Sequence, residues 1–362
     1  MMDMQTTYIH QPLLFAGEVA AAKFPGTRYQ GSKAKLADWI WDQIKNLAFD
    51  TCLDAFGGTG AVAYRLKQEG KQVTYNDILR FNYYIGVALI ENNATQLTTE
   101  DIDWILARHS HIDYPNFITK TFRDIYFTDE ENAWLDQTIT NINYISNPYK
   151  FALAFFALAQ AAIIKRPYNL FHRKNLYVRL ADVERSFGNK TSWDRPFTAW
   201  FCDFMTEANQ AVFDNGRANQ ALNLDALDIP GTYDLVYIDT PYISRQGEGV
   251  DYRDFYHFLE GLTMYETWKT QIDYRSKHRR LKRSPSVWAN KQRIYDAFDR
   301  LFDYFRDSIL VVSYRSDGIP SVEEILTLLK KYKRDVRVEW FGQYKYVLST
   351  NHRSEEILFV AK

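Results

Sequence analysis

Four consecutive residues, Asp239, Thr240, Pro241 and Tyr242, place two hydrogen-bond acceptors beside an aromatic ring. They follow the apolar run YDLVYI, which predicts a buried strand. Pro241 makes the turn rigid and keeps the preceding residue extended, so the Thr240 carbonyl and the Asp239 carboxylate can both point at a ligand. Two acceptors next to a flat ring suit an exocyclic amine on an aromatic heterocycle. The alternative is an ordinary turn with an N-capping aspartate, which is what most isolated matches to this pattern would be.

A glycine-rich turn lies upstream, in the segment DAFGGTG from Asp54 to Gly60. Gly58 and Gly60 would let the backbone turn sharply and let a ligand approach the main chain. The segment lacks the Gly-Lys-Ser/Thr of a P-loop, and Ala63 replaces the third glycine of a dinucleotide-binding motif. Asp77 ends the next apolar run about twenty residues on, where a carboxylate can accept hydrogen bonds from ribose hydroxyls. These residues predict an adenosine-containing ligand, either a dinucleotide or S-adenosylmethionine.

A parallel sheet must position both turns. Residues 51–78 show the pattern of a strand, a glycine turn, a helix and a second strand, which is a βαβ unit with a right-handed crossover. Residues 33–47 carry apolar positions at helical spacing and predict an amphipathic helix. Further strands are predicted at 233–239, 308–314, 336–341 and 357–360. A turn at the carboxyl end of such a parallel strand is where open α/β sheets bind ligands.

Residues 92–214 have a different pattern, which is mostly helical and has few β-branched runs. The apolar stretch 151–164 is shorter than the ~20 residues of a membrane span and predicts a buried helix. We therefore predict an α/β domain formed by residues 1–91 and 215–362, interrupted by an inserted helical subdomain at 92–214.

Composition narrows the class of protein. Of the 362 residues 46% are hydrophobic and 25% are charged, which is typical of a soluble globular protein. Lys plus Arg number 44 and Asp plus Glu 45, so the net charge of -1 indicates no particular partner. The two cysteines, Cys52 and Cys202, exclude a disulfide framework and a four-thiolate zinc site. No secretory signal opens the chain and the histidines form no ligand pattern, so we expect a cytoplasmic protein without a metal.

These motifs together identify a family resemblance. The chain resembles the Dam-like DNA adenine-N6 methyltransferases of the D12 class (alpha group), over most of its length and in the order of that class. The matching residues are Tyr29 and Lys33 in the N-terminal cofactor motif, Asp54, Phe56, Gly58 and Gly60 in the glycine turn, Asp77 and Asp225 as the acids near the cofactor ribose and adenine, and Asp239 to Tyr242 in the catalytic motif, usually DPPY. The segment beginning at Ser313 (SYRSDG) resembles the late motif of the class, and TFRDIYFTDEENAWLD resembles its insert.

The resemblance implies a Rossmann-like, S-adenosylmethionine-dependent methyltransferase sheet with a mostly helical inserted target-recognition subdomain. It implies methyl transfer from S-adenosylmethionine to N6 of a flipped-out adenine in double-stranded DNA. Such an enzyme would be the modification enzyme of a restriction-modification system, with a separately encoded cognate restriction endonuclease, or an orphan or phage methylase. We expect a prokaryotic or phage-encoded protein that is a monomer or a weak dimer. Thr240 departs from the family's proline, but it retains the backbone carbonyl that this position contributes.

Two basic segments predict the DNA-binding surface. Residues 150–181 hold six Lys or Arg and no acid, and part of this segment resembles the family's target-reading stretch. Its candidate DNA contacts are Arg166, Tyr168, Asn169, Arg173 and Asn175. Leu170 stands where the family usually has glycine, and a solvated helix end is the alternative interpretation of the segment.

The second basic segment, 268–293, has nine Lys or Arg against one acid. We predict that it forms a DNA-contacting insertion at 263–295, in which four residues bind phosphates: Arg279, Arg280, Lys282 and Arg283. Basic runs are more often solvated surfaces, but this one follows the catalytic turn. Residues 251–257, between the catalytic turn and this basic segment, are predicted to form a lip over the target base.

Four other functions remain open at this level. A methyltransferase of the same fold could act on RNA, on cytosine N4 or on a protein amide. Asp239 favours adenine N6, because the cytosine-N4 relatives usually carry Ser or Asn there and protein glutamine methylation usually pairs with Asn. A catalytically inert DNA-binding protein is the alternative from another class. The intact Gly58, Gly60, Asp77 and Asp239 speak against it.

Overall fold

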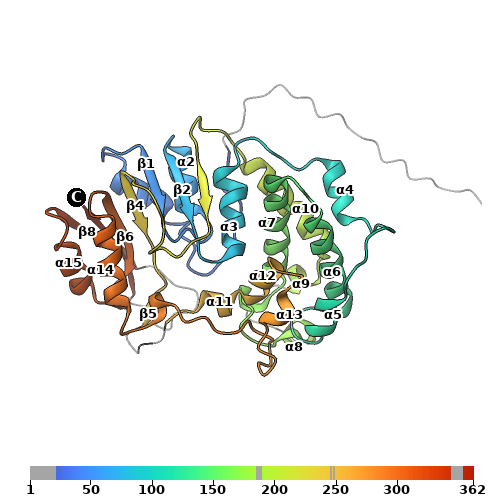
Figure 1. The fold of residues 1–362 in the computed structure, drawn as a ribbon. Helices are drawn as coiled ribbons and strands as arrows, with labels where there is room; N and C mark the ends of the chain where they lie inside the picture. The colour runs from blue at the N-terminus through green and yellow to red at the C-terminus, as the bar shows by residue number, and fades with distance from the viewer. Residues whose placement is uncertain (1–21, 185–189, 245–246, 248, 344–353) are drawn as a thin grey trace, which may run out of the picture.

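The computed structural model describes residues 22–184, 190–244, 247, 249–343 and 354–362, so residues 1–21 of the predicted α/β domain lie outside the described part. Within it, seven strands form one sheet in the order β3-β2-β1-β4-β6-β9-β8 (Figure 1). In that order the strands are β3 (Gln220–Leu222), β2 (Gln72–Asn76), β1 (Thr51–Asp54), β4 (Leu235–Ile238), β6 (Ile309–Arg315), β9 (Glu355–Ala361) and β8 (Val336–Gln343). The predicted α/β class is confirmed, and each strand predicted from its apolar pattern is present.

The order in which strands are added to the sheet reverses at its centre. β1 pairs in parallel with both β2 and β4, and the chain extends outward to β3 on one side and to β6 on the other. β9 is antiparallel to both of its neighbours, β6 and β8. Open sheets bind ligands outside the carboxyl ends of their strands at such a reversal. The glycine turn follows β1 and the Asp239 turn follows β4, both at this reversal.

Alternate residues of each strand enter two different apolar cores. Cys52 of β1 and Tyr237 of β4 belong to one core, and their neighbours Leu53 and Val236 belong to the other. The first core includes α1 (Ala37–Ile44), α2 (Ala61–Gln68), α3 (Arg80–Gly86) and the π-helix η1 (Val87–Glu91). The second includes α14 (Ile294–Tyr304), α15 (Val322–Leu329) and the short helix η3 (Val287–Ala289). The sheet is covered on both faces, which explains why β4 is apolar throughout.

The chain between η1 and β3 is mostly helical. Its helices are α4 (Thr99–Leu106), α5 (Phe117–Thr121), α6 (Asp129–Asn143), α7 (Pro148–Ile164), η2 (Pro167–Asn169), α8 (Leu176–Leu180), α9 (Lys190–Asp194) and α10 (Phe197–Ala211). α7, the predicted buried helix, contacts both α3 and α10. One apolar cluster continues from the sheet face into these helices, so the helical region shares its core with the sheet. Among the described residues, no helix combines the length and apolarity needed to cross a membrane.

The chain after β4 returns to the helical region before it rejoins the sheet. It forms the antiparallel pair β5 (Ile243–Ser244) with β7 (Gly318–Ile319), and then α11 (Tyr252–Phe255), α12 (His257–Leu262) and α13 (Trp268–Gln271). The Phe258 and Trp268 rings lie 5.0 and 4.9 Å from the ring of Phe122, which follows α5. Trp268 also packs directly on Gly261, where an added Cβ would lie 1.9 Å from the indole. The first part of the predicted insertion 263–295 is therefore anchored to the helical region, as Figure 1 shows for α12 and α13.

Candidate active site

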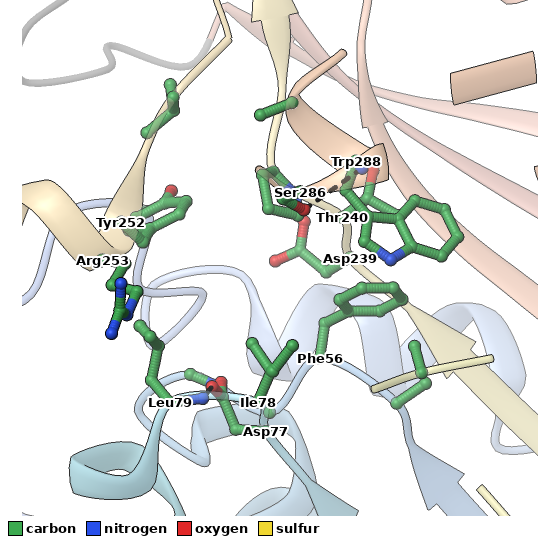
Figure 2. A pocket seen from close by; sticks show the side chains of 18 of the residues that line it. Phe56, Asp77, Ile78, Leu79, Asp239, Thr240, Tyr252, Arg253, Ser286 and Trp288 are labelled. Atoms are coloured by element: carbon green, nitrogen blue, oxygen red, sulfur yellow. Dashed lines mark hydrogen bonds between the residues drawn. The ribbon is translucent and has the colours of Figure 1, made fainter. Parts of the chain in front are cut away.

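A cavity of about 710 Å³ opens where β1, β2 and β4 end, within the range of roughly 300–1,000 Å³ for small-molecule sites. Figure 2 shows Asp77 and Asp239 on its wall, with Phe56 and Trp288 on one side and Tyr252 on the other. The sequence-predicted residues in this wall are Tyr29, Lys33, Asp54, Phe56, Gly58, Asp77, Asp225, Asp239, Thr240, Pro241 and Tyr242. Gly60 precedes α2 as its N-cap. Residues that are far apart in the sequence therefore surround one cavity.

The glycine turn after β1 has the sharp backbone that its sequence predicts. Gly58 and Gly60 have φ values of 52° and 75°, which favour glycine. Gly57 is required for a different reason, because a Cβ there would lie 2.0 Å from the ring of Tyr75. The turn is thus shaped partly by ring packing from β2.

Asp77 fixes the glycine turn against the end of β2. Its carboxylate accepts hydrogen bonds from the backbone N–H groups of Gly58 (2.9 Å) and Leu79 (2.8 Å) and from the Asn82 amide (3.1 Å). Burial raises the pKa of Asp77 to about 6, although these donors oppose the rise. Asp77 is therefore an ionised acceptor at neutral pH and loses its charge in mild acid.

Asp54 brings a second carboxylate to the cavity. It is almost completely buried, and its Oδ1 has no hydrogen-bond partner among the described residues. Burial, with the nearby charges of Asp239 and Asp77, raises the pKa of Asp54 to about 8. A buried acceptor without a donor is costly unless a ligand supplies one. At neutral pH Asp54 is mostly protonated, and a ligand with a cationic or N–H donor group at this position would favour its ionised form.

The other side of the cavity is apolar and aromatic. The Phe56 and Trp288 rings meet edge to face at 4.9 Å, and the Ile78 side chain is 60% exposed at the rim. Asp225 lies in the same wall, where its Oδ1 accepts from the Leu227 N–H at 3.0 Å. An apolar slot beside carboxylates fits a flat heterocycle. Trp288 was missed from the sequence because it stands at the end of a basic run that predicts phosphate contacts.

The Asp239 turn presents two acceptors to the cavity, as its sequence predicts. Both side-chain hydrogen bonds of Asp239 fall on Oδ1, from the Tyr242 hydroxyl at 2.7 Å and from Lys33 Nζ at 3.0 Å. Oδ2 and the Thr240 carbonyl accept no hydrogen bond from the described residues. The Tyr242 ring, expected beside the two acceptors, is only 6% exposed and contacts Tyr314 edge to face. Its hydroxyl instead orients Asp239.

Lys33 is the buried cation beside the Asp239 turn. Its buried ammonium lies 3.0 Å from Asp239 Oδ1, 2.7 Å from the Tyr242 hydroxyl and 3.1 Å from Glu356 Oε1. Burial lowers the pKa of Lys33, but the two carboxylates outweigh it and hold the pKa well above its usual value. Sequence reasoning missed Glu356. The only signal was an acid next to the apolar run ILFV of the last strand.

Three tyrosines stack at one end of the cavity, and two of them, Tyr29 and Tyr252, line it. The Tyr29 ring lies between Tyr256 at 4.5 Å and Tyr252 at 5.6 Å, nearly parallel to both. Gly31 has φ +84°, and a Cβ there would lie 2.6 Å from the Tyr252 hydroxyl. The segment predicted as a lip thus packs through Tyr252 on the N-terminal motif. The described residues contain no group of three or more potential metal ligands.

Comparison with known proteins agrees with this geometry. The family model of the D12 class N6 adenine-specific DNA methyltransferases matches residues 29–267. The type II methyltransferase M2.HphI of Haemophilus parahaemolyticus is 31% identical over 350 residues, covering 94% of this chain and 98% of that protein. The chain belongs to the D12 class of adenine-N6 DNA methyltransferases.

More distant relatives cover much of this methyltransferase. The type II methyltransferase M.CviAII of Paramecium bursaria Chlorella virus 1 is 24% identical, over 91% of this chain and 97% of that protein. M.FokI of Planomicrobium okeanokoites is 27% identical over 84% of this chain, which spans 47% of that longer protein. The solved rRNA methyltransferase aviRa of Streptomyces viridochromogenes aligns with 14% identity and a TM-score of 0.29, covering 96% of this chain and 90% of that chain.

Two of the predicted DNA contacts of the methyltransferase are wrong, because Arg166 and Asn175 are buried. Arg166 is 1% exposed, and its guanidinium donates to Asn175 Oδ1 and to the backbone carbonyls of Tyr126 (3.2 Å) and Leu170 (3.3 Å). It also lies 4.3 Å from the Tyr126 ring centroid. These contacts tie the chain after α7 to the chain after α5. Arg166 is therefore an internal connector and cannot reach a base edge.

Other residues of the target-reading stretch remain at the surface. Tyr168 is 52% exposed, and Tyr168 and Asn169 have φ values of 62° and 58°. This left-handed pair precedes Leu170, which is extended, so Leu170 itself does not require the glycine that the family usually has. Arg173 is exposed. Tyr168, Asn169 and Arg173 stay predicted DNA contacts.

The second basic segment forms a hairpin at residues 271–283, closed by the bridge between Ile272 and Leu281. Three of its predicted phosphate contacts have internal partners. Arg279 donates to the Tyr274 carbonyl, Arg280 pairs with Asp273 at 3.5 Å, and Lys282 Nζ donates to the Thr270 carbonyl at 2.8 Å. Arg283 is exposed and lies on the cavity wall. Of these four, Arg283 is the best placed to meet DNA beside the cavity.

The burial of Arg166 gives the first prediction. Arg166→Met should lower the free energy of unfolding by about 3 kcal/mol or more, since several buried acceptors lose their donor. Urea unfolding at neutral pH would measure the change. The exposed control Arg173→Met should stay within about 0.5 kcal/mol of the wild type. A stable Arg166→Met protein with altered sequence preference would restore Arg166 as a base-reading residue.

Proposed function

We propose that this adenine-N6 DNA methyltransferase transfers a methyl group from S-adenosylmethionine to a flipped-out adenine within a specific sequence of double-stranded DNA. The observation that carries the proposal is the orientation of the Asp239 turn. Internal donors occupy one carboxylate oxygen, while the other oxygen and the Thr240 carbonyl remain as acceptors beside the cavity. Two acceptors at this position match the two hydrogens of an exocyclic amine.

The cavity fits S-adenosylmethionine. Asp77 would accept from the ribose hydroxyls, and the apolar slot with Phe56 and Ile78 would hold the adenine ring, with Asp225 nearby. The unpartnered Oδ1 of Asp54 suits a cationic group of the methionine part. The left-handed glycines let the ligand approach the backbone of the turn. When bound, S-adenosylmethionine supplies a methyl group already activated by its sulfonium.

The protein groups around the target amine act by orientation. Adenine N6 is a poor nucleophile because its lone pair is delocalised into the ring. Hydrogen bonds to Asp239 Oδ2 and the Thr240 carbonyl pull this nitrogen toward sp³ geometry and expose the lone pair for in-line attack. The second N6 proton leaves after methyl transfer, with Asp239 as a hydrogen-bond acceptor rather than a strong base. Lys33 and Tyr242 keep Oδ1 fixed, so the carboxylate cannot rotate.

The target base must leave the duplex before it can reach this turn, which costs about a few kcal/mol. Stacking on an aromatic side chain contributes about 1–3 kcal/mol toward that cost. The Tyr242 ring lines the cavity, but Lys33 Nζ lies 5.1 Å from its centroid and Tyr314 meets it edge to face. Tyr252, on the opposite wall, is therefore the stronger candidate for the stacking surface, and Tyr242 acts chiefly through its hydroxyl.

The helical region and the basic hairpin 271–283 would hold the DNA. Exposed Tyr168 and Arg173, with the half-buried Asn169, are placed to read bases, and Arg283 to bind a phosphate beside the cavity. The relatives named as type II methyltransferases support a role as the modification enzyme of a restriction-modification system. A separately encoded cognate endonuclease is then the expected partner.

Cofactor affinity should depend on the ionised Asp77. S-adenosylmethionine should bind once per chain, and its affinity should fall as the pH drops through about 6, because protonation removes an acceptor. Asp77→Asn should weaken binding about tenfold or more at neutral pH and abolish this pH dependence. Calorimetry between pH 5 and 8 measures both effects, with the exposed Asp228→Asn as control. Unchanged binding by Asp77→Asn would remove Asp77 from the site.

Methyl transfer should require the Asp239 carboxylate. Asp239→Asn should slow single-turnover transfer by about 100-fold or more, because the amide is a weaker acceptor, while both substrates still bind. Tyr242→Phe keeps the ring and removes only the hydroxyl. It should slow single-turnover transfer about five- to tenfold, which corresponds to the loss of one hydrogen bond. The assay is radiolabelled methyl incorporation into duplex DNA. Near-normal turnover of Asp239→Asn would contradict the proposed chemistry.

Arg283 should contribute to DNA affinity without sequence preference. Arg283→Ala should weaken binding to cognate and scrambled duplexes equally. It should also flatten the slope of log K against log salt by about 0.9, the value for one phosphate contact. Fluorescence anisotropy at several salt concentrations measures the slope. Arg300→Ala, an exposed arginine of α14, is the matched control and should leave it unchanged. A specific loss on the cognate duplex alone would make Arg283 a base-reading residue.

A further inference from the structure

A carboxylate of the last strand is buried behind the Asp239 turn. Glu356 of β9 is 0% exposed. Its Oε1 lies 3.1 Å from Lys33 Nζ and accepts a hydrogen bond of 2.6 Å from the Ser313 hydroxyl of β6. Isolated buried carboxylates are strongly disfavoured, so such a group is retained only with good partners. The partners of Glu356 include Lys33 and Ser313, and Lys33 also holds Asp239.

Asp239 and Glu356 share one ammonium. Among the described residues, Lys33 is within salt-bridge distance of both carboxylates, at 3.0 Å from Asp239 and 3.1 Å from Glu356. Because the Lys33 charge is divided between two carboxylates, it neutralises Asp239 less than it would in a simple ion pair.

We propose that Glu356 is a positioning residue for methyl transfer, which competes with Asp239 for the Lys33 ammonium and thereby keeps the Asp239 carboxylate a strong acceptor for the target amine. The proposal rests on the proposed role of Asp239. Paired with Lys33 alone, Asp239 would be more fully neutralised and would bind the amine hydrogens less strongly. With Glu356 present, Lys33 still fixes the orientation of Asp239 but neutralises it only in part.

The electrostatic surroundings of Asp239 agree with this competition. Burial raises the pKa of Asp239, Lys33 opposes the rise, and Glu356 adds to it. The titratable and charged groups around Asp239 are Lys33, Asp54, Asp77, Tyr237, Tyr242, Tyr252, Arg315 with its partner Asp317, and Glu356. Among these, Glu356 is the anion that shares the Lys33 ammonium.

Glu356→Gln removes the charge but keeps the shape, since the amide oxygen can still accept from Lys33 and Ser313. The single-turnover rate is measured against pH with saturating cofactor and duplex. The acid limb of this pH–rate profile should move by about 1 pH unit toward lower pH. The rate on the plateau should fall, because Asp239 becomes the weaker acceptor. Saturation keeps the titration of Asp77 out of this measurement.

Ser313→Ala perturbs the same place but leaves the charge on Glu356. Glu356 then depends more on Lys33 and draws it away from Asp239, so the acid limb should move toward higher pH. A merely structural role for Glu356 predicts that both variants lose rate at all pH values without a shift in opposite directions. If Glu356→Gln does not fold, as tested by circular dichroism, Ser313→Ala decides by itself: an upward shift supports the proposal, and an unmoved or downward acid limb overturns it.

Asp239→Asn in the same assay separates this inference from the proposed function. If Asp239→Asn is active, the assignment of Asp239 is wrong and the role of Glu356 falls with it. If Asp239→Asn is inactive but Glu356→Gln keeps the wild-type acid limb, only the competition for Lys33 is wrong. An inactive Asp239→Asn with a downward shift in Glu356→Gln supports both.

Discussion

The buried ammonium of Lys33 is the interaction on which the arrangement of the site depends. It joins the N-terminal segment, the turn after β4 and the last strand of the sheet through Asp239, Tyr242 and Glu356. None of these segments is adjacent in sequence. Removing one partner of a buried ion pair is strongly destabilising, by about 3–5 kcal/mol, so the cluster also fixes how the three segments meet. The geometry of the Asp239 turn is thus a consequence of long-range pairing.

Sheet topology explains why the motifs could be found from the sequence. The glycine turn, Asp77 and the Asp239 turn each follow an apolar strand pattern, and parallel strands end at one edge of their sheet. Local patterns therefore predicted the cavity wall without any knowledge of contacts. Trp288 and Glu356 could not be predicted in this way. Each reaches the site through packing between distant elements, and neither stands in a pattern that periodicity distinguishes.

Arg166 shows that composition alone does not distinguish a segment that reads DNA from one that stabilises the protein interior. A basic, aromatic stretch with asparagines has the same residue types whether it reads DNA or stabilises a loop. Its guanidinium is satisfied by carbonyls and by the aromatic faces of Tyr126 and Phe171, because the chain after α7 must pack against the chain after α5. Burial decides between the two roles, and burial depends on the whole helical region. Arg173, seven residues on, has the opposite environment and is exposed.

The two ligand surfaces are built differently, and the difference follows from what each must bind. Every acceptor proposed for the cofactor lies at the end of a strand or is held by the backbone, as Asp77 is by Gly58 and Leu79. The surface proposed for DNA lies on short helices and a hairpin, attached through aromatic contacts such as that of Trp268 with Phe122. A cofactor that is the same in every turnover favours fixed acceptors, whereas a duplex whose sequence must be read favours side chains presented on surface loops and short helices. The hairpin leads directly into residues 283–290 of the cavity wall, so the segment proposed to meet the phosphates also places Trp288 beside Phe56.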